Sequence, residues 1–213
     1  MDPEKLLLQI SNGKTLSPEE VEELIHLLEG AAVGDELRRD ISLDDVYSYL
    51  VVLGRAKCTR ARHVLERYLE MRDPLTVALV LEVLCLEWGF TEEFLERVVN
   101  FAVGVAWDYD EDVKQTALKI LGEYLLTSLR SRKENDGAML PREQRVIDLL
   151  FTTFDDQAGK IWCRQAAYFA LCRAGGLSWE ELPGECTSLD FSSRKGEVRY
   201  DVLDRLRALA GGE

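Results

Sequence analysis

Apolar residues recur every three or four positions along most of this chain, which is the spacing of one buried face of an α-helix. Ser17-Pro18-Glu19-Glu20 has the composition of a capping box with a first-turn proline, and Asp73-Pro74 is a similar start signal. We find no convincing strand pattern, so the sequence predicts an all-α fold. The predicted helices are at about 18–29, 42–55, 59–71, 74–87, 92–106, 111–130, 142–154, 159–174 and 198–210.

One helical sequence occurs twice, and the two copies differ at several positions. Val113–Gly122 is echoed fifty positions later by Cys163–Cys172, and in each copy a basic residue precedes an alanine by three positions and a leucine follows that alanine by four. The end of the same sequence recurs at Tyr49–Gly54. Repeated helix pairs at such periods are typical of solenoids. We therefore predict a right-handed α-solenoid of stacked antiparallel helix hairpins.

The predicted helices form successive pairs within one continuous domain. We expect 131–140 to be an insertion between hairpins, because it is polar and contains glycine. The pairs are 18–29 with 42–55, 59–71 with 74–87, 92–106 with 111–130, and 142–154 with 159–174. The domain spans 1–213, with an N-terminal cap at 1–41, a repeat array at 42–174 and a C-terminal cap at 175–213.

Acidic residues precede the second helix of two pairs, and a basic residue lies in its first turn. The residues are Asp110–Asp112 with Lys114, and Asp155–Asp156 with Arg164. This pattern, over about residues 42–174, resembles the HEAT-repeat family. The resemblance implies that second helices line a concave binding face.

One second helix contains an unusual carboxylate. Between residues 75 and 86 only Thr76 and Glu82 are polar, so we expect this helix to be buried on more than one side. A carboxylate in so apolar a helix must face solvent along a narrow strip or find a partner. Given the resemblance, we expect Glu82 to project into the binding groove, with Glu87 and Trp88 at the end of the helix.

A narrower resemblance comes from three stretches: Val83–Leu95, Val105–Asp108, and the end of the acid-led helix at Leu121–Leu125. Together they look like bacterial HEAT-like proteins, some of which are immunity proteins encoded beside polymorphic toxins. This resemblance implies a small acidic cytosolic protein that neutralises a basic, nuclease-type toxin by covering its active site.

The charge of the chain is distributed unevenly. The formal net charge is −13, and residues 1–112 hold 24 acids and 11 bases whereas residues 113–213 hold 15 of each. Such a field repels phosphate backbones and attracts basic proteins, so we expect a protein partner rather than nucleic acid. A role in solubility alone is the alternative.

The strongest surface candidate is the acidic cluster that follows Trp107. It comprises Asp108, Asp110, Glu111 and Asp112. We predict that it binds a basic partner, with Trp107 as a further candidate contact. It lacks the glycine turn and distal glutamate of a calcium loop. Ordinary charge complementation of a helix N-terminus remains an alternative interpretation.

Catalysis has little support in the sequence. The two histidines lie on separate predicted helices without a second metal ligand at helical spacing, and no phosphate-binding loop or nucleophile elbow occurs. HEAT-like DNA glycosylases use aromatic residues in a basic groove. Here Trp107 adjoins Asp108 and Trp162 lies near Lys160, but no continuous basic track accompanies them. We interpret both tryptophans as packing anchors.

We therefore predict a non-enzymatic protein-binding protein without a cofactor or metal. The alternatives are a general adaptor or assembly scaffold, and an enzyme of the glycosylase or bilin-lyase type. Cys85, Cys163 and Cys172 lie in apolar helical patterns and read as buried hydrophobic residues. No apolar run reaches the roughly 18 residues of a membrane span, and the first residues lack a secretory pattern, so we expect a cytoplasmic protein.

Overall fold

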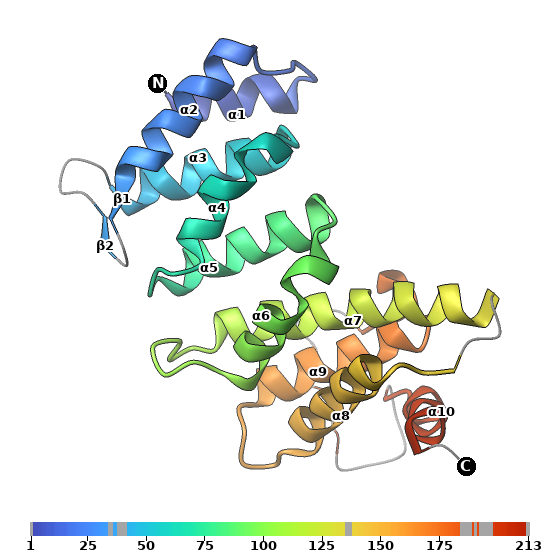
Figure 1. Ribbon diagram of the computed structural model, residues 1–213. Coiled ribbons are helices and arrows are strands. Elements are labelled where there is room, and N and C mark those ends of the chain that lie inside the picture. The colour runs from blue at the N-terminus through green and yellow to red at the C-terminus, as the bar shows by residue number, and fades with distance from the viewer. Residues whose placement is uncertain are drawn as a thin grey trace. The chain divides into compact units, whose positions relative to one another are not determined.

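A computed structural model of the chain describes residues 2–33, 36–37, 42–134, 138–183, 189, 191 and 198–211. The regular secondary structure of the described residues is helical apart from one short antiparallel strand pair (Figure 1). The all-helical prediction is therefore confirmed. The expectation of no strands is wrong only for β1 and β2, which have two residues each. Strands this short do not produce an alternating hydrophobic pattern in the sequence. The elements are α1 (Pro3–Ser11), α2 (Pro18–Ala31), β1 (Ala32–Val33), β2 (Glu36–Leu37), α3 (Leu43–Arg55), η1 (Thr59–Ala61), α4 (Arg62–Tyr68), α5 (Pro74–Leu81), the π-helical η2 (Glu82–Glu87), α6 (Thr91–Val103), α7 (Asp112–Glu134), α8 (Pro141–Asp155), α9 (Ile161–Ala174), η3 (Trp179–Glu181) and α10 (Tyr200–Gly211).

The chain divides into two compact units. Unit 1 comprises Met1–Phe94 and Ala106–Val113, and unit 2 comprises Leu95–Val105 and Lys114–Glu213. Helices α6 and α7 each begin in unit 1 and continue into unit 2. The expectation of one continuous array with caps at both ends stays a prediction.

The helices of unit 1 begin where their capping residues predict. The Ser17 hydroxyl accepts a hydrogen bond from the Glu20 N–H at 3.2 Å, and the Glu20 carboxylate accepts from the Ser17 N–H at 2.7 Å. Ser42 caps α3 through the Asp45 N–H, and Asp73 caps α5. Each cap satisfies a backbone N–H that has no acceptor inside the helix. The unpredicted α1 starts at another Asp-Pro pair.

Unit 1 is built from helix pairs that pack in sequence order. α2 contacts α3, and α4 contacts α5. Between pairs, α2 contacts α4 while α3 contacts both α5 and η2. Val46, Tyr49, Leu50 and Leu53, which recur at helical spacing in α3, are buried, and this helix has neighbours on two sides. The Tyr68 hydroxyl donates to the Leu28 carbonyl at 2.8 Å, which joins α4 to α2 inside the core.

The predicted helix at 74–87 is not one α-helix. α5 ends at Leu81, and η2 continues it with π-helical hydrogen bonds, including one from the Trp88 N–H to the Val83 carbonyl at 2.9 Å. α5 contacts both α3 and α4, in agreement with the expected burial on more than one side, although Leu75 in its first turn is 62% exposed. The predicted helix at 59–71 is also shorter, because it opens as the 3-10 turn η1 and α4 ends at Tyr68.

In unit 2, α8 packs against α9, and α10 contacts both. Helix α7 meets α9 at Gly122, where an added Cβ would lie 2.6 Å from the Cα of Ala170. The absence of a side chain at Gly122 therefore sets how closely these helices approach. The contact joins the two copies of the repeated helical sequence, because Gly122 ends the first copy and Ala170 lies in the second.

Several predicted boundaries in unit 2 differ from the structure. α6 ends at Val103 rather than near 106, since Gly104 adopts a φ of 114°. α7 extends to Glu134, so residues 131–134 are helical and not an insertion, while 135–137 lie outside the described residues. Of the apolar residues at helical spacing in the predicted helix at 198–210, Val202 and Leu206 are buried in α10, whereas Leu209 is 61% exposed.

Candidate partner-binding surface

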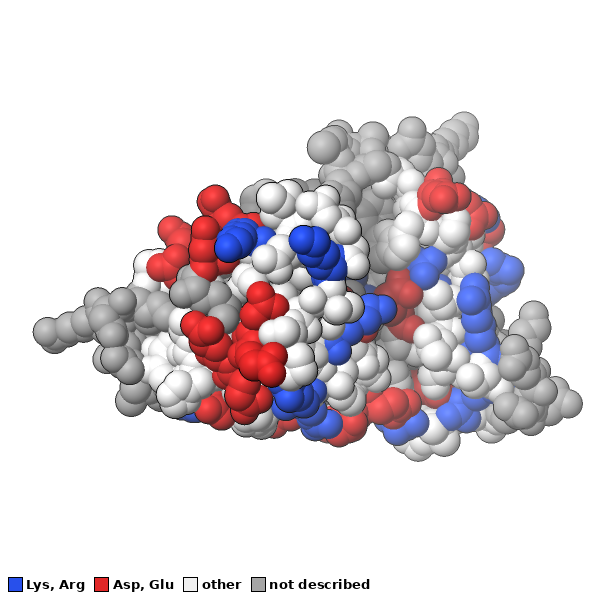
Figure 2. Space-filling model, turned by 90° about the horizontal axis from the view of Figure 1, so that it is seen from above, with Lys and Arg blue, Asp and Glu red and all other residues white. Residues whose placement is uncertain are grey.

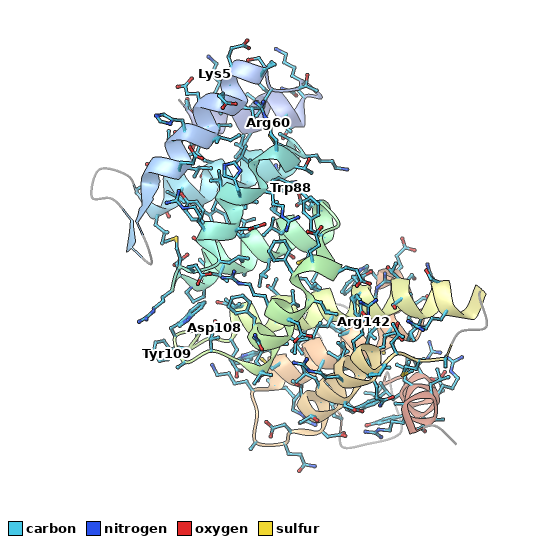
Figure 3. The ribbon with its side chains drawn as sticks, viewed as in Figure 1. Lys5, Arg60, Trp88, Asp108, Tyr109 and Arg142 are labelled. Carbon is cyan, nitrogen blue, oxygen red and sulfur yellow. The ribbon has the colours of Figure 1, made fainter. Side chains whose placement is uncertain are left out.

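The seven predicted partner-binding residues all belong to unit 1, but they occupy two places. One group lies on η2 and the other in the connection from α6 to α7. In Figure 3, Trp88 at the end of η2 lies well apart from Asp108 and Tyr109 in the connection. The structure therefore does not bring the two groups together. The first group is Glu82 and Glu87, and the second is Trp107, Asp108, Asp110, Glu111 and Asp112.

A tight turn forms the second group, and we call residues 107–112 the acidic loop. The Glu111 N–H donates to the Asp108 carbonyl at 3.1 Å, and Glu111 adopts the left-handed conformation with a φ of 63°. Few residues other than glycine adopt this conformation. The turn places Tyr109 and Asp110 at its tip, where the Tyr109 side chain is 80% exposed.

Not every acid of the loop faces solvent. Asp108 is only 5% exposed, so its prediction as a surface charge is wrong. Burial is explained by its position at the base of the turn, where its carbonyl accepts the Glu111 N–H. Trp107, Glu111 and Asp112 are half-buried. The loop therefore presents to solvent the aromatic ring of Tyr109 and, next to it in the sequence, the exposed carboxylate of Asp110.

The position of Asp112 agrees with the alternative interpretation of the cluster, in which its acids complement the charge of a helix N-terminus. Asp112 is the first residue of α7, where a carboxylate complements the partial positive charge of the helix N-terminus. Tyr109 is not among the predicted site residues. The sequence does contain a signal for it, because Tyr109 is an aromatic residue between two acids in the segment that joins the predicted helices at 92–106 and 111–130.

The η2 group lies against α3. The Trp88 indole N–H donates to the Gly54 carbonyl at 3.3 Å. A Cβ added to Gly54 would lie 3.3 Å from Oε2 of Glu87, so this carboxylate also reaches the end of α3. Glu87 is exposed, whereas Glu82 is half-buried at the start of the π-helical turn. Whether Glu82 lines a binding groove stays a prediction.

The whole net charge of the protein belongs to unit 1. Its residues include 23 acids and 10 lysines and arginines, whereas unit 2 has 16 of each. Figure 2 looks onto α1 and α2 from above and shows acidic side chains next to one another, with basic side chains beside them. Some acids are paired, as in the 3.4 Å contact between Arg60 and Glu22. The acidic loop therefore belongs to a unit with a strongly negative field.

A cluster of side chains around Arg62 in unit 1 has a structural role. The Arg62 guanidinium forms ion pairs with Glu66 and Glu93 and lies 4.7 Å from the centroid of the Phe90 ring and 5.1 Å from that of Phe94. Hydrogen bonds from Arg62 to the two carboxylates raise the pKa of the guanidinium. Because its partners come from α4 and from the start of α6, the cluster ties these two helices together.

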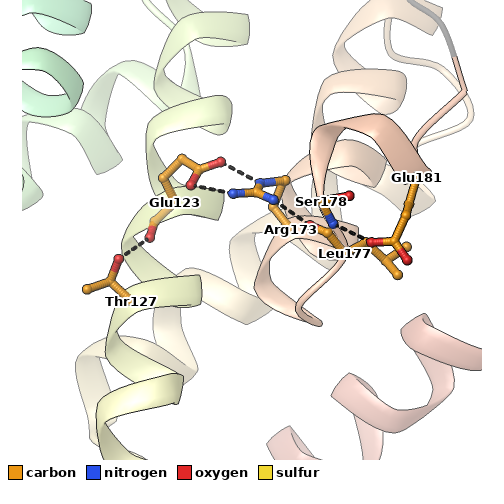
Figure 4. Close-up of polar contacts among 6 residues, drawn as sticks. All are labelled: Glu123, Thr127, Arg173, Leu177, Ser178 and Glu181. Carbon is orange, nitrogen blue, oxygen red and sulfur yellow. Dashed lines mark hydrogen bonds and ion pairs between the residues drawn. The ribbon is translucent and has the colours of Figure 1, made fainter.

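Unit 2 contains a half-buried ion pair between the residues that directly follow the two copies of the repeated helical sequence (Figure 4). Arg173 donates to both carboxylate oxygens of Glu123, at 2.6 Å and 2.9 Å, and also to the Leu177 carbonyl. Its guanidinium lies 5.2 Å from the ring centroid of Trp179. The sequence carries a signal for this pair, because Glu123 and Arg173 directly follow the two copies at equivalent positions.

A fully buried carboxylate joins α7 to α8. Glu143 is fully buried and accepts hydrogen bonds from the Ser128 hydroxyl, from Arg132 Nε at 2.6 Å and from the Leu140 N–H at 2.7 Å. Burial alone would raise the pKa of Glu143, but the bonds from Arg132, Ser128 and Leu140 together lower it. Sequence reasoning missed this cluster, because Arg132 and Leu140 lie inside the predicted insertion at 131–140, where no helix contact was expected.

Other residues considered for chemistry have different surroundings. Trp162 is 47% exposed with Lys160 Nζ 5.8 Å from its ring centroid, so its prediction as a packing anchor is wrong. Cys85, Cys163 and Cys172 are buried, as predicted. Burial raises the pKa of the Cys85 thiol to about 12 and that of Cys172 to about 11. Both thiols are therefore protonated at neutral pH.

The described residues contain no group of three or more histidine, cysteine, aspartate or glutamate side chains placed to hold a metal ion. Among the same residues, no helix combines the length and the apolar character that crossing a bilayer requires.

Comparison with known proteins identifies no relative: no family model, no curated protein and no solved structure matches the chain.

Proposed function

We propose that this protein is a non-catalytic α-solenoid of HEAT-like repeats that binds a basic protein through the acidic loop. One observation carries the proposal: Tyr109 is 80% exposed beside Asp110 at the tip of a fixed turn, in the unit that holds the entire net charge. Aromatic residues anchor many protein interfaces, and complementary charge raises the rate and specificity of association.

The packing within each unit supports the solenoid architecture. In unit 1, α2 contacts α4 and α3 contacts α5, so two successive pairs stack with their first and second helices aligned. A glycine within a second helix marks the contact in both units. A Cβ on Gly54 would lie 2.6 Å from Val83 Cγ2, and Gly122 has the same relation to Ala170. Gly175 after α9 closely approaches Val202 of α10.

The partner that suits this surface is a basic protein domain. An exposed ring beside a carboxylate can stack on a guanidinium while the acid neutralises its charge. A toxin nuclease is such a domain, because its active site must attract phosphate. We therefore propose an immunity role in the bacterial cytoplasm, in which the acidic loop contacts the basic active-site surface of the cognate toxin.

The test is capture of the partner from native lysate with the tagged protein, at low and at high salt, with identification by mass spectrometry. The proposal expects one dominant basic protein that high salt releases. A toxin domain would support the immunity role, whereas a subunit of an ordinary cellular complex would favour an adaptor.

A loop variant and a matched control make this test specific. Asp110→Asn removes one exposed carboxylate from the acidic loop, and Glu23→Gln removes one from the exposed face of α2 in the same unit. Asp110→Asn should reduce capture and Glu23→Gln should leave it nearly unchanged. Equal capture by both variants would contradict binding through the loop.

A further inference from the structure

We draw no further inference here: the strongest candidate, the exposed apolar patch that Ile161 and Trp162 form at the start of α9 in unit 2, carries nothing because nothing in the structure shows what covers it.

Discussion

Tyr109 is the residue on which the proposed interface most depends. Replacing an aromatic anchor by alanine typically costs about 2 kcal/mol or more of binding free energy. Tyr109→Ala should therefore weaken the complex by about 30-fold. Because the side chain is largely exposed, the stability of the protein should change by no more than about 0.5 kcal/mol. Titration calorimetry with the captured partner measures the first effect and thermal unfolding the second.

Tyr47→Ala provides the control for this prediction. Tyr47 lies on α3 in the same unit and is 39% exposed, but it is not part of the acidic loop. The control should retain the affinity of the unaltered protein. If Tyr47→Ala weakens binding as much as Tyr109→Ala, the loop has no special role.

Glu143 makes a larger difference to stability than any exposed acid. Glu143→Ala leaves Arg132 without its buried carboxylate and should lower the free energy of unfolding by about 3 kcal/mol or more. Glu96→Ala is the matched control in unit 2, because Glu96 also pairs with an arginine, Arg145, but its side chain is 71% exposed. Its loss should cost about 0–1 kcal/mol. Equal denaturation midpoints for the two variants would contradict this ranking.

The lowered pKa of Glu143 also predicts a pH dependence. A carboxylate whose pKa is depressed by folding stabilises the protein fully above its unfolded value, near 4.5, and this contribution is lost as pH falls through the lower folded value. Urea midpoints measured between about pH 7 and pH 3 should therefore fall more steeply for the unaltered protein than for Glu143→Gln. Parallel curves would show that another group controls the acid response.

At the scale of elements, Gly122 determines how α7 and α9 pack. Gly122→Ala places a methyl group against the backbone of Ala170, which cannot move aside as a flexible side chain can. We expect a loss of about 1–3 kcal/mol, as for other overpacked contacts. Gly211→Ala at the end of α10 is the control, since a Cβ there meets nothing within 4 Å. Thermal unfolding of both variants tests this, and an unchanged midpoint for Gly122→Ala would show that the helices can separate at little cost.

Helix starts could be predicted because their causes are local. Ser17, Ser42 and Asp73 each lie within three residues of the N–H group that they cap, so the sequence contains the whole interaction. The π-helical turn of η2 could not be predicted in this way. The residues at its end contact a residue far away in sequence, as in the hydrogen bond from the Trp88 indole N–H to the Gly54 carbonyl. The local spacing of residues cannot predict a partner at that distance.

The candidate site was predicted only in outline for a similar reason. Acid spacing located the loop at 107–112, but spacing does not show which side chain a tight turn directs inward. Asp108 is buried and Tyr109 is exposed, which reverses the simple expectation that acids face water and aromatic residues pack inside. The left-handed Glu111 is part of this turn, and its conformation follows from the fold rather than from its own preference.

At the scale of the whole molecule, the uneven charge predicts how salt affects binding. Unit 1 holds the net charge of −13, so a basic partner should be steered toward it at low ionic strength. Raising the salt concentration from about 0.05 to 0.5 M should slow association roughly tenfold or more and change dissociation much less. Stopped-flow mixing with the captured partner measures both rates. A salt dependence confined to dissociation would contradict electrostatic steering.

The division of the chain has a consequence for anyone who wishes to isolate its parts. The backbone leaves unit 1 after Phe94, returns at Ala106 and leaves again after Val113. A gene fragment that encodes only residues 1–94 would therefore omit Tyr109. A fragment that encodes residues 1–113 would include residues 95–105 of unit 2 without the rest of that unit. A single stop codon or protease cut cannot separate the two units. Swapping one unit between related chains would require three junctions, two of them inside helices.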